Sequence, residues 1–119
     1  MAKHTILVTG GCGYIGSHTI IDLIDHGYEV VSADNLVNAT EDTLARVEQI
    51  TGVAVTNYRI DLVDQAATLE LFHRHDFAGV IHFAALKAVG ESVEQPWRYY
   101  HNNINSLLNI LAGMEASQV

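Results

Sequence analysis

The sequence predicts an α/β domain in which a parallel β-sheet is covered by helices on both faces. Short apolar, β-branched segments alternate four times with longer segments of helical periodicity, a pattern typical of doubly wound parallel sheets. The composition agrees, because 49% of the residues are hydrophobic, 17% are charged and only one is proline. That balance indicates a packed globular core. At 119 residues, the chain is long enough for one domain at most.

The first strand–helix–strand unit is predicted over residues 5–33. Residues 5–8 (TILV) are apolar and β-branched, which predicts a buried strand. Residues 14–26 place their apolar side chains on one side of a helix, and Gly27 follows where a C-terminal cap belongs. Residues 29–33 (EVVSA) predict the second strand.

The next unit is predicted over residues 40–60. A helix is expected over residues 40–50, with Thr40 as its N-cap, acidic residues in its first turn and Gly52 at its end. Residues 53–60 then predict a third strand.

The last predicted elements are two helices and a strand. Asp64 is expected to cap a helix that ends at Arg74, and residues 79–83 (GVIHF) predict the fourth strand. Residues 84–95 are expected to form a long loop. Pro96 fits the first turn of the final helix, where its missing N–H is not needed.

The final predicted helix carries apolar side chains on more than one of its faces. We expect one set of side chains to cover the sheet and a second set to extend the stripe around the helix. The first set is Trp97, Tyr100, Leu107, Leu108 and Leu111, and the second is Tyr99, Ile110 and Met114. Because a strand usually follows such a helix, we expect Val119 not to end the functional unit.

Residues 7–16 (LVTGGCGYIG) hold the most informative motif. Gly10, Gly13 and Gly16 are spaced three apart, and residues 11–16 fit the pattern G-x-G-x-x-G. Between a buried strand and a helix, this pattern predicts a dinucleotide-binding turn of Rossmann type. One glycine permits a positive φ, a second lets the backbone approach a pyrophosphate, and Gly16 lets the helix pack closely on the sheet. A glycine-rich turn without a ligand is the alternative.

Acidic residues follow the second and third predicted strands. Asp34 lies 18 residues beyond Gly16, where a carboxylate can bind the hydroxyls of an adenine ribose and disfavours a 2′-phosphate. NAD is therefore expected rather than NADP, unless Asp34 is simply a solvated residue at a strand end. Asp61 and Leu62 are expected to flank an adenine, and a turn-forming Asp61 is an equally weighted alternative.

Small residues follow the fourth predicted strand. Phe83, Ala84 and Ala85 allow the backbone to pass close to a cofactor, and a plain exit from the strand is the alternative. The seven histidines are scattered. Only His73 and His75 are close, and their i, i+2 spacing on a helix directs the side chains apart, so no metal site is expected.

Charge and cysteine content narrow the classes of function. The net charge of −8 argues against binding to nucleic acid or to anionic membranes. No apolar run reaches the roughly 18 residues of a membrane span, and no signal peptide is recognised at the N-terminus. The single Cys12 cannot form an internal disulfide, so a cytoplasmic location is expected.

Four sequence motifs together resemble the extended short-chain dehydrogenase/reductase family. They are TGGCGYIG at residues 9–16, DNL at 34–36, HFAALKAVGES at 82–92 and PWRYYHNNINS at 96–106. Within that family the resemblance is closest to the enzymes that epimerise C4 of UDP-glucose and UDP-galactose. It covers essentially all residues, and it implies that residues 1–119 are the NAD-binding, N-terminal part of such an enzyme, with the substrate domain absent.

The resemblance implies a tightly held NAD that takes a hydride from C4 of a UDP-sugar and returns it to the other face of a 4-keto intermediate. It assigns the cofactor to Gly10, Gly13, Tyr14, Ile15, Gly16, Asp34, Asn35, Asn38, Asp61, Leu62, Phe83, Ala84, Ala85, Lys87 and Asn102. A cation at Lys87 offsets pyrophosphate charge, although lysines are usually solvated surface residues.

The resemblance also shows what is missing. The family's catalytic Tyr-x-x-x-Lys pair is absent, because neither Lys3 nor Lys87 lies four residues after a tyrosine. No catalytic residue is therefore assigned, and the chain is expected to be inactive alone. Cys12 replaces a small residue, and its thiol at a helix start is expected to be somewhat acidified.

Three alternatives remain open from the sequence. The reaction could be a dehydration, a decarboxylation or an epimerisation at another carbon of a nucleotide sugar. The chain could instead be a non-catalytic NAD-binding module. In the resembled family the final helix contributes to a two-fold dimer, so homodimerisation is expected, with contact to the rest of the same chain as the equally weighted alternative.

Overall fold

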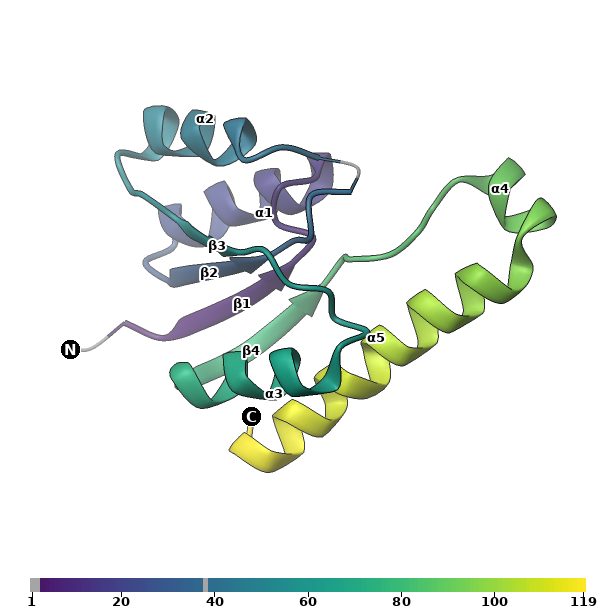
Figure 1. Cartoon of the computed structure of the whole chain (residues 1–119). Coiled ribbons are helices and arrows are strands. Elements are labelled where there is room, and N and C mark those ends of the chain that lie inside the picture. Colours follow the sequence, from purple (N-terminus) through teal and green to yellow (C-terminus); the bar gives the residue numbers. More distant parts are fainter. Residues whose placement is uncertain (1–2, 38) are drawn as a thin grey trace.

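The computed structural model describes residues 3–37 and 39–119 and contains a parallel sheet with helices on both faces (Figure 1). In chain order, the elements are β1 (Thr5–Thr9), α1 (Tyr14–Asp25), β2 (Glu29–Ala33), α2 (Asp42–Thr51), β3 (Thr56–Tyr58), α3 (Gln65–Arg74), β4 (Phe77–His82), α4 (Val89–Glu94) and α5 (Pro96–Ser117). The predicted fold class is therefore confirmed.

The strands are arranged in the order β3-β2-β1-β4, and every neighbouring pair is parallel. Leu7 in β1 is paired with Val31 on one side and with Val80 on the other. The connection from β1 therefore leads to one side of the sheet, and β4 later returns to the other side of β1. In open α/β sheets, ligands bind in the crevice that such a reversal leaves at the carboxyl ends of the strands.

Each face of the sheet has its own apolar core. Successive side chains of a strand point to opposite faces. Leu7 packs with Phe72 and Ile110 beneath α3 and α5, whereas Val8 packs with Ile20 beneath α1 and α2. Both β1 residues are fully buried, which explains why the strand is an uninterrupted apolar run. Figure 1 shows α1 and α2 on one face and α3 and α5 on the other.

Several predicted helix boundaries are confirmed by local geometry. Gly27 and Gly52 follow α1 and α2 with φ angles of +88° and +74°, a left-handed conformation that favours glycine. At the start of α3, Asp64 Oδ1 accepts a hydrogen bond from the backbone N–H of Ala67 at 3.2 Å. Asp64 is therefore the N-cap that the sequence predicts.

Two predictions in the second unit are wrong. Thr40 does not cap α2, which begins at Asp42 after Glu41 without any side-chain cap. Thr40 contributes only its carbonyl, which accepts from the N–H of Thr43 at 3.3 Å. The third strand contains only three residues; it ends early because the chain turns at Ile60, whose N–H binds the carbonyl of Tyr58 at 3.0 Å.

The prediction for the final helix is also wrong in its orientation. The residues of α5 that are buried are Tyr99, Ser106, Ile110 and Gly113. The residues expected to cover the sheet are exposed instead: Trp97, Tyr100, Leu107, Leu108 and Leu111. Gly113 explains the choice of face, because a Cβ there would overlap the ring of Phe72 in α3. Gly113 allows α5 and α3 to approach, and the five residues expected to cover the sheet lie on the opposite, exposed side of α5.

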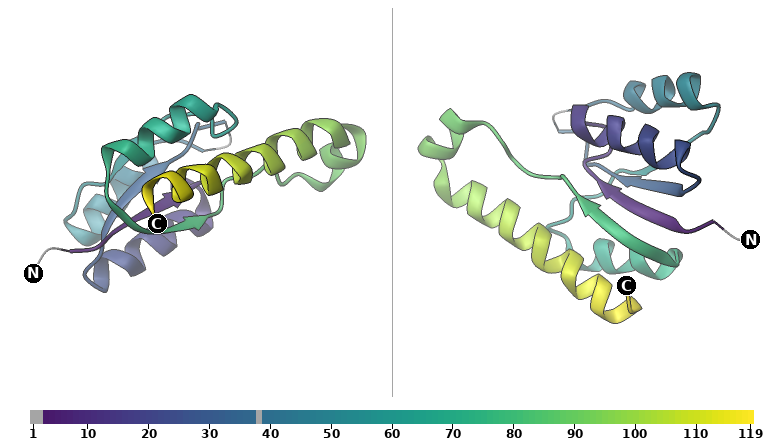
Figure 2. Two further views of the ribbon diagram at one scale, coloured as in Figure 1. Left: turned by 90° about the horizontal axis from the view of Figure 1, so that it is seen from below. Right: turned by 180° about the vertical axis from the view of Figure 1, so that it is seen from behind.

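The segment that precedes α5 is more ordered than predicted. Residues 84–95 contain α4, and α4 with the first half of α5 extends away from the sheet (Figure 2). Within residues 3–37 and 39–119, no helix has both the length and the apolar character needed to cross a bilayer.

Candidate functional site

A cavity of about 530 Å³ lies at the carboxyl ends of the strands. Its walls are the β1–α1 turn, the end of β2, the segment after β3, the segment after β4 and one side of α5. Every predicted site residue that the structure describes lines it: Gly10, Gly13, Tyr14, Ile15, Gly16, Asp34, Asn35, Asp61, Leu62, Phe83, Ala84, Ala85, Lys87 and Asn102. Asn38 lies outside the described residues.

Further lining residues were not predicted from the sequence. They are Ala33, Val37, Ala39, Ile60, Leu86, Ala88 and Ser106. Most are small or apolar and give no chemical signal of a binding role. Ser106 is the exception, because it lies four residues after Asn102, and i, i+4 residues share one face of a helix.

The β1–α1 turn forms one wall, in which three of the lining residues, Gly10, Gly13 and Gly16, have no side chain. Gly10 has a φ of +70°, and its N–H binds the carbonyl of Ala33 at 2.8 Å. A Cβ at Gly16 would overlap the carbonyl oxygen of Gly10, and a Cβ at Gly11 would overlap Ser32 in β2. Gly16 therefore brings the helix against the turn itself, and Gly11, rather than the predicted Gly16, allows the close approach to the sheet.

The start of α1 is open toward the cavity. Its N-cap is Gly13, and no side chain accepts a hydrogen bond from the first turn. The flanking Tyr14 is 81% exposed. Free N–H groups at a helix start, together with the helix dipole, favour a bound anion.

Asp34 is held in a fixed orientation at the end of β2. Its Oδ2 accepts from the N–H of Cys12 at 3.1 Å, and its Oδ1 accepts from the N–H of Leu36 at 2.9 Å. Asn57 donates to the carbonyl of Asp34 at 3.1 Å and accepts from the hydroxyl of Ser32 at 2.8 Å. A carboxylate has about four acceptor positions, so Asp34 retains acceptors for a ligand.

Asp61 and Leu62 line the cavity and also stabilise their own segment. Asp61 Oδ1 accepts from the N–H of Val63 at 3.0 Å, which is the turn geometry that the sequence left open. Leu62 is 5% exposed, and its carbonyl accepts from Asn109 Nδ2 at 2.8 Å. The turn role and the lining role therefore coexist in this segment.

Thr9 connects the end of β1 to the end of β4. It is fully buried, and its Oγ1 accepts from the N–H groups of Phe83 and Ala84 at 3.0 and 3.2 Å. The hydroxyl lies 2.6 Å from His82 Nδ1, so we assign it as the donor and Nδ1 as the acceptor. Burial, followed by the positive charge of Lys87, lowers the pKa of His82 below its ordinary value of 6.5.

The prediction of an acidified Cys12 thiol is wrong. Cys12 is 2% exposed, and burial, followed by the charge of Asp34, raises the pKa of its thiol to about 11. The thiol is therefore protonated at neutral pH and packs as a small apolar group.

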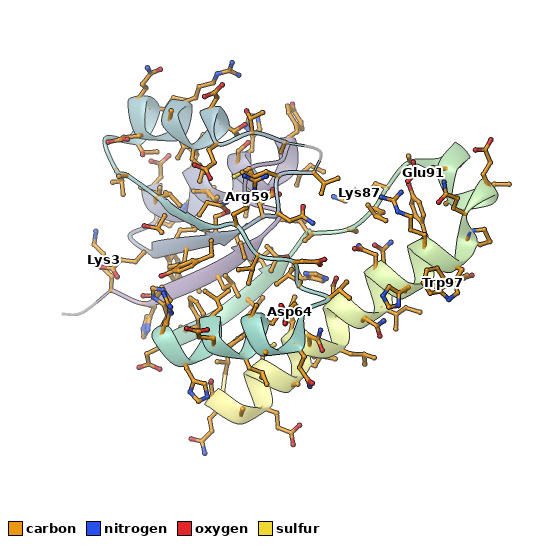
Figure 3. The ribbon with its side chains drawn as sticks, in the orientation of Figure 1. Lys3, Arg59, Asp64, Lys87, Glu91 and Trp97 are labelled. Carbon is orange, nitrogen blue, oxygen red and sulfur yellow. The ribbon has the colours of Figure 1, made fainter. Side chains whose placement is uncertain are left out.

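Lys87 lies on the segment that joins β4 to α4 (Figure 3). Among the described residues that line the cavity, it is the only basic one. In the described parts of the chain, no three His, Cys, Asp or Glu side chains gather closely enough to hold a metal ion.

Comparison with known proteins gives a family and close relatives. A family model described as GDP-mannose 4,6 dehydratase matches residues 7–119. The UDP-glucose 4-epimerase of Bacillus subtilis is 51% identical over 110 residues, which cover 92% of this chain and 32% of that protein. The bifunctional protein GAL10 of Candida maltosa is 46% identical over 120 residues, which cover 100% of this chain and 78% of that sequence.

The fold also matches solved structures. The crystal structure of UDP-glucose 4-epimerase from Bifidobacterium longum in complex with NAD+ and UDP has a TM-score of 0.93 and 49% sequence identity, and the match covers 97% of this chain and 34% of that one. The chain thus spans about a third of the length of these epimerases.

Proposed function

Because this chain belongs to the family whose model is described as GDP-mannose 4,6 dehydratase, we propose that it is the NAD-binding, N-terminal part of a UDP-glucose 4-epimerase. The observation that supports this most directly is the cavity, which gathers a bare glycine turn and an oriented carboxylate at one edge of the sheet. The similarity to epimerases, one of them bound to NAD+ and UDP, supports the same proposal.

The described residues fit a dinucleotide. A Cβ at Gly13 would meet only the carbonyl oxygen of Gly10, at 3.3 Å, so the space beside the helix start is free for a pyrophosphate. We assign the pyrophosphate to the turn with Tyr14 and Ile15, and the adenine ribose to Asp34 with Asn35 and Asn38. The adenine is assigned to Asp61 and Leu62, and the remainder of the cofactor to Phe83, Ala84, Ala85, Lys87 and Asn102.

When bound, NAD supplies reversible hydride acceptance at C4 of the sugar. The residues of this chain bind and orient the cofactor, and they contribute no acid or base to the reaction. We place the proton-transferring residues and the UDP-sugar site outside these 119 residues, in agreement with the fraction of the epimerases that the chain spans. The same proposal includes a cytoplasmic location and a homodimer that uses the exposed face of α5.

A binding experiment tests the cofactor proposal. We expect Asp34→Arg to weaken NAD binding more than about tenfold, because hydrogen bonds to a charged group contribute about 1.5–3 kcal/mol each. Asp25→Arg is the matched control, since it makes the same charge change at an exposed position of α1 that does not line the cavity. Titration calorimetry with NAD and NADP measures both. Equal affinities of the two variants for NAD would refute the role of Asp34.

An activity measurement tests the reaction. Full-length protein with UDP-galactose and NAD should yield UDP-glucose without net formation of NADH. The description of the family model favours one second candidate, a dehydration of a nucleotide sugar. Analysis of the products by mass spectrometry separates them, because dehydration removes the mass of one water and epimerisation leaves the mass unchanged. NAD binding without either product would favour a non-catalytic module.

A further inference from the structure

The backbone on both sides of Lys87 is bound by side chains of α5. Lys87 itself lies on a segment outside regular secondary structure, between β4 and α4. Its neighbours Leu86 and Ala88 each form hydrogen bonds with a residue of α5 that is 11 or 17 positions further along the chain. The basic residue of the cavity is thus the middle residue of a segment that another element holds in place.

Asn103 forms the stronger of these attachments. Its Oδ1 accepts from the N–H of Leu86 at 2.9 Å, and its Nδ2 donates to the carbonyl of Leu86 at 3.1 Å. The side-chain amide therefore pairs with both backbone groups of Leu86, as a neighbouring strand would. Asn102 Nδ2 donates to the same Oδ1 at 2.9 Å, which fixes the orientation of the Asn103 amide.

Tyr99 forms the second attachment, one helical turn before Asn103. Its hydroxyl accepts from the N–H of Ala88 at 3.2 Å and donates to Glu91 Oε1 at 3.1 Å. Burial, followed by the hydrogen bond to Glu91, raises the pKa of Tyr99, so the hydroxyl remains a donor. Arg98 also forms an ion pair with Glu91, and Figure 3 shows Glu91 at the outer end of this region.

We propose that Asn103 and Tyr99 are positioning residues that fix the direction of Lys87 toward the bound diphosphate. An unrestrained segment of this kind samples several backbone conformations, and ordering it costs free energy when a ligand binds. Side chains of a rigid helix remove that cost before binding. The inference rests on the proposed binding of NAD and adds two residues that act through Lys87.

A double-mutant cycle tests the inference in the full-length protein, with NAD titrated by calorimetry. Asn103→Ala is expected to weaken binding about 3- to 10-fold, the effect of one or two hydrogen bonds. In a Lys87→Met background the same change is expected to weaken binding less than about twofold, because the ammonium group that Asn103 is proposed to orient is absent. An equal effect of Asn103→Ala in both backgrounds overturns the proposal, since a general structural role is additive.

Asn109→Ala is the matched control. Asn109 also lies on α5 and also forms two hydrogen bonds, to the carbonyls of Leu62 and Val63 at 2.8 and 3.0 Å. Its effect is expected to be additive with Lys87→Met. Tyr99→Phe removes one hydroxyl without changing packing. If Asn103→Ala does not fold, the coupling in NAD affinity between Tyr99→Phe and Lys87→Met tests the proposal instead. Absence of NAD binding by the unmodified protein would refute the proposed function instead.

Discussion

Two walls of the cavity, the β1–α1 turn and the segment after β4, are built in opposite ways. The turn at residues 10–16 is shaped by the absence of side chains, because a Cβ at Gly16 would overlap the backbone of Gly10. The segment at residues 84–88 is shaped by side chains of a distant helix, through Asn103 and Tyr99. The first wall therefore depends on close backbone contacts within the turn and with the ends of β2 and β4, whereas the second depends on side chains of α5.

This difference predicts how each wall responds to substitution. At Gly10 and Gly16 backbone meets backbone with no room to relax, so a side chain added at either position is costly. A segment held by separate hydrogen bonds can lose one of them and keep the rest, so its responses are graded. The buried hydroxyl of Thr9 connects the two walls, because it lies at the end of β1 and accepts from the segment after β4.

The largest effect is expected where α5 is anchored to the core. Ile110→Ala should lower the free energy of unfolding by about 2–5 kcal/mol, because it leaves a cavity beside Leu7 and Phe72. In the monomer, where Leu108 is 53% exposed, Leu108→Ala should change it by no more than about 0.5 kcal/mol. Urea unfolding measures both. Equal losses would mean that the orientation of α5 is wrong.

The next effect is expected in the turn. Gly16→Ala should cost about 1–3 kcal/mol of stability, because the new Cβ overlaps the carbonyl of Gly10. Gly90→Ala is the control, since a Cβ there meets nothing within 4 Å, and alanine in a helix should add about 0.5–1 kcal/mol. Thermal unfolding followed by circular dichroism compares the two. A tolerated Gly16→Ala would contradict the description of a rigid turn.

A smaller effect is expected at the connection between the walls. Thr9→Val keeps the volume but removes the acceptor for Ala84, one of the two acceptors for Phe83, and the donor to His82. Stability should fall by about 1 kcal/mol. Thr9→Ser, which retains the hydroxyl, should recover most of this loss in urea unfolding. If Ser and Val behave alike, the hydroxyl does not connect the walls.

The smallest effect is expected from His82. Because the pKa of His82 lies below 6.5 in the folded protein, the unfolded chain binds its proton more readily, and stability falls as the pH drops below about 6.5. Above that pH the contribution is complete. His82→Asn should remove this part of the pH dependence. Urea unfolding of both proteins between pH 8 and 5 measures it, as the difference between their free energies of unfolding at each pH. Parallel curves would exclude His82 as its source.

Local patterns were sufficient for much of the fold and, in the cavity, for the glycine turn and Asp34. The strands β1 and β2, the cap at Asp64 and the ends of α1 and α2 follow from residues that are close in sequence. The glycine spacing and Asp34 follow the ends of neighbouring parallel strands, and such ends meet at one edge of a sheet. Local chemistry therefore places those residues together without knowledge of the packing.

Other features depended on packing that no local pattern encodes. The apolar periodicity of α5 is satisfied by two different faces, and the contact of Gly113 with Phe72 selects the face with smaller side chains. The thiol of Cys12 lies at a helix start, which favours a lower pKa, yet burial dominates and raises it.

The sequence by itself determined the order of the elements other than α4, the turn beneath the first helix and the position of Asp34, because each arises from neighbours along the chain or from strand ends. The direction of α5, the role of Thr9 and the attachments of Asn103 and Tyr99 to the segment around Lys87 were decided in three dimensions. Those contacts join residues between 11 and 75 positions apart, and only the packed structure brings such residues within hydrogen-bond distance.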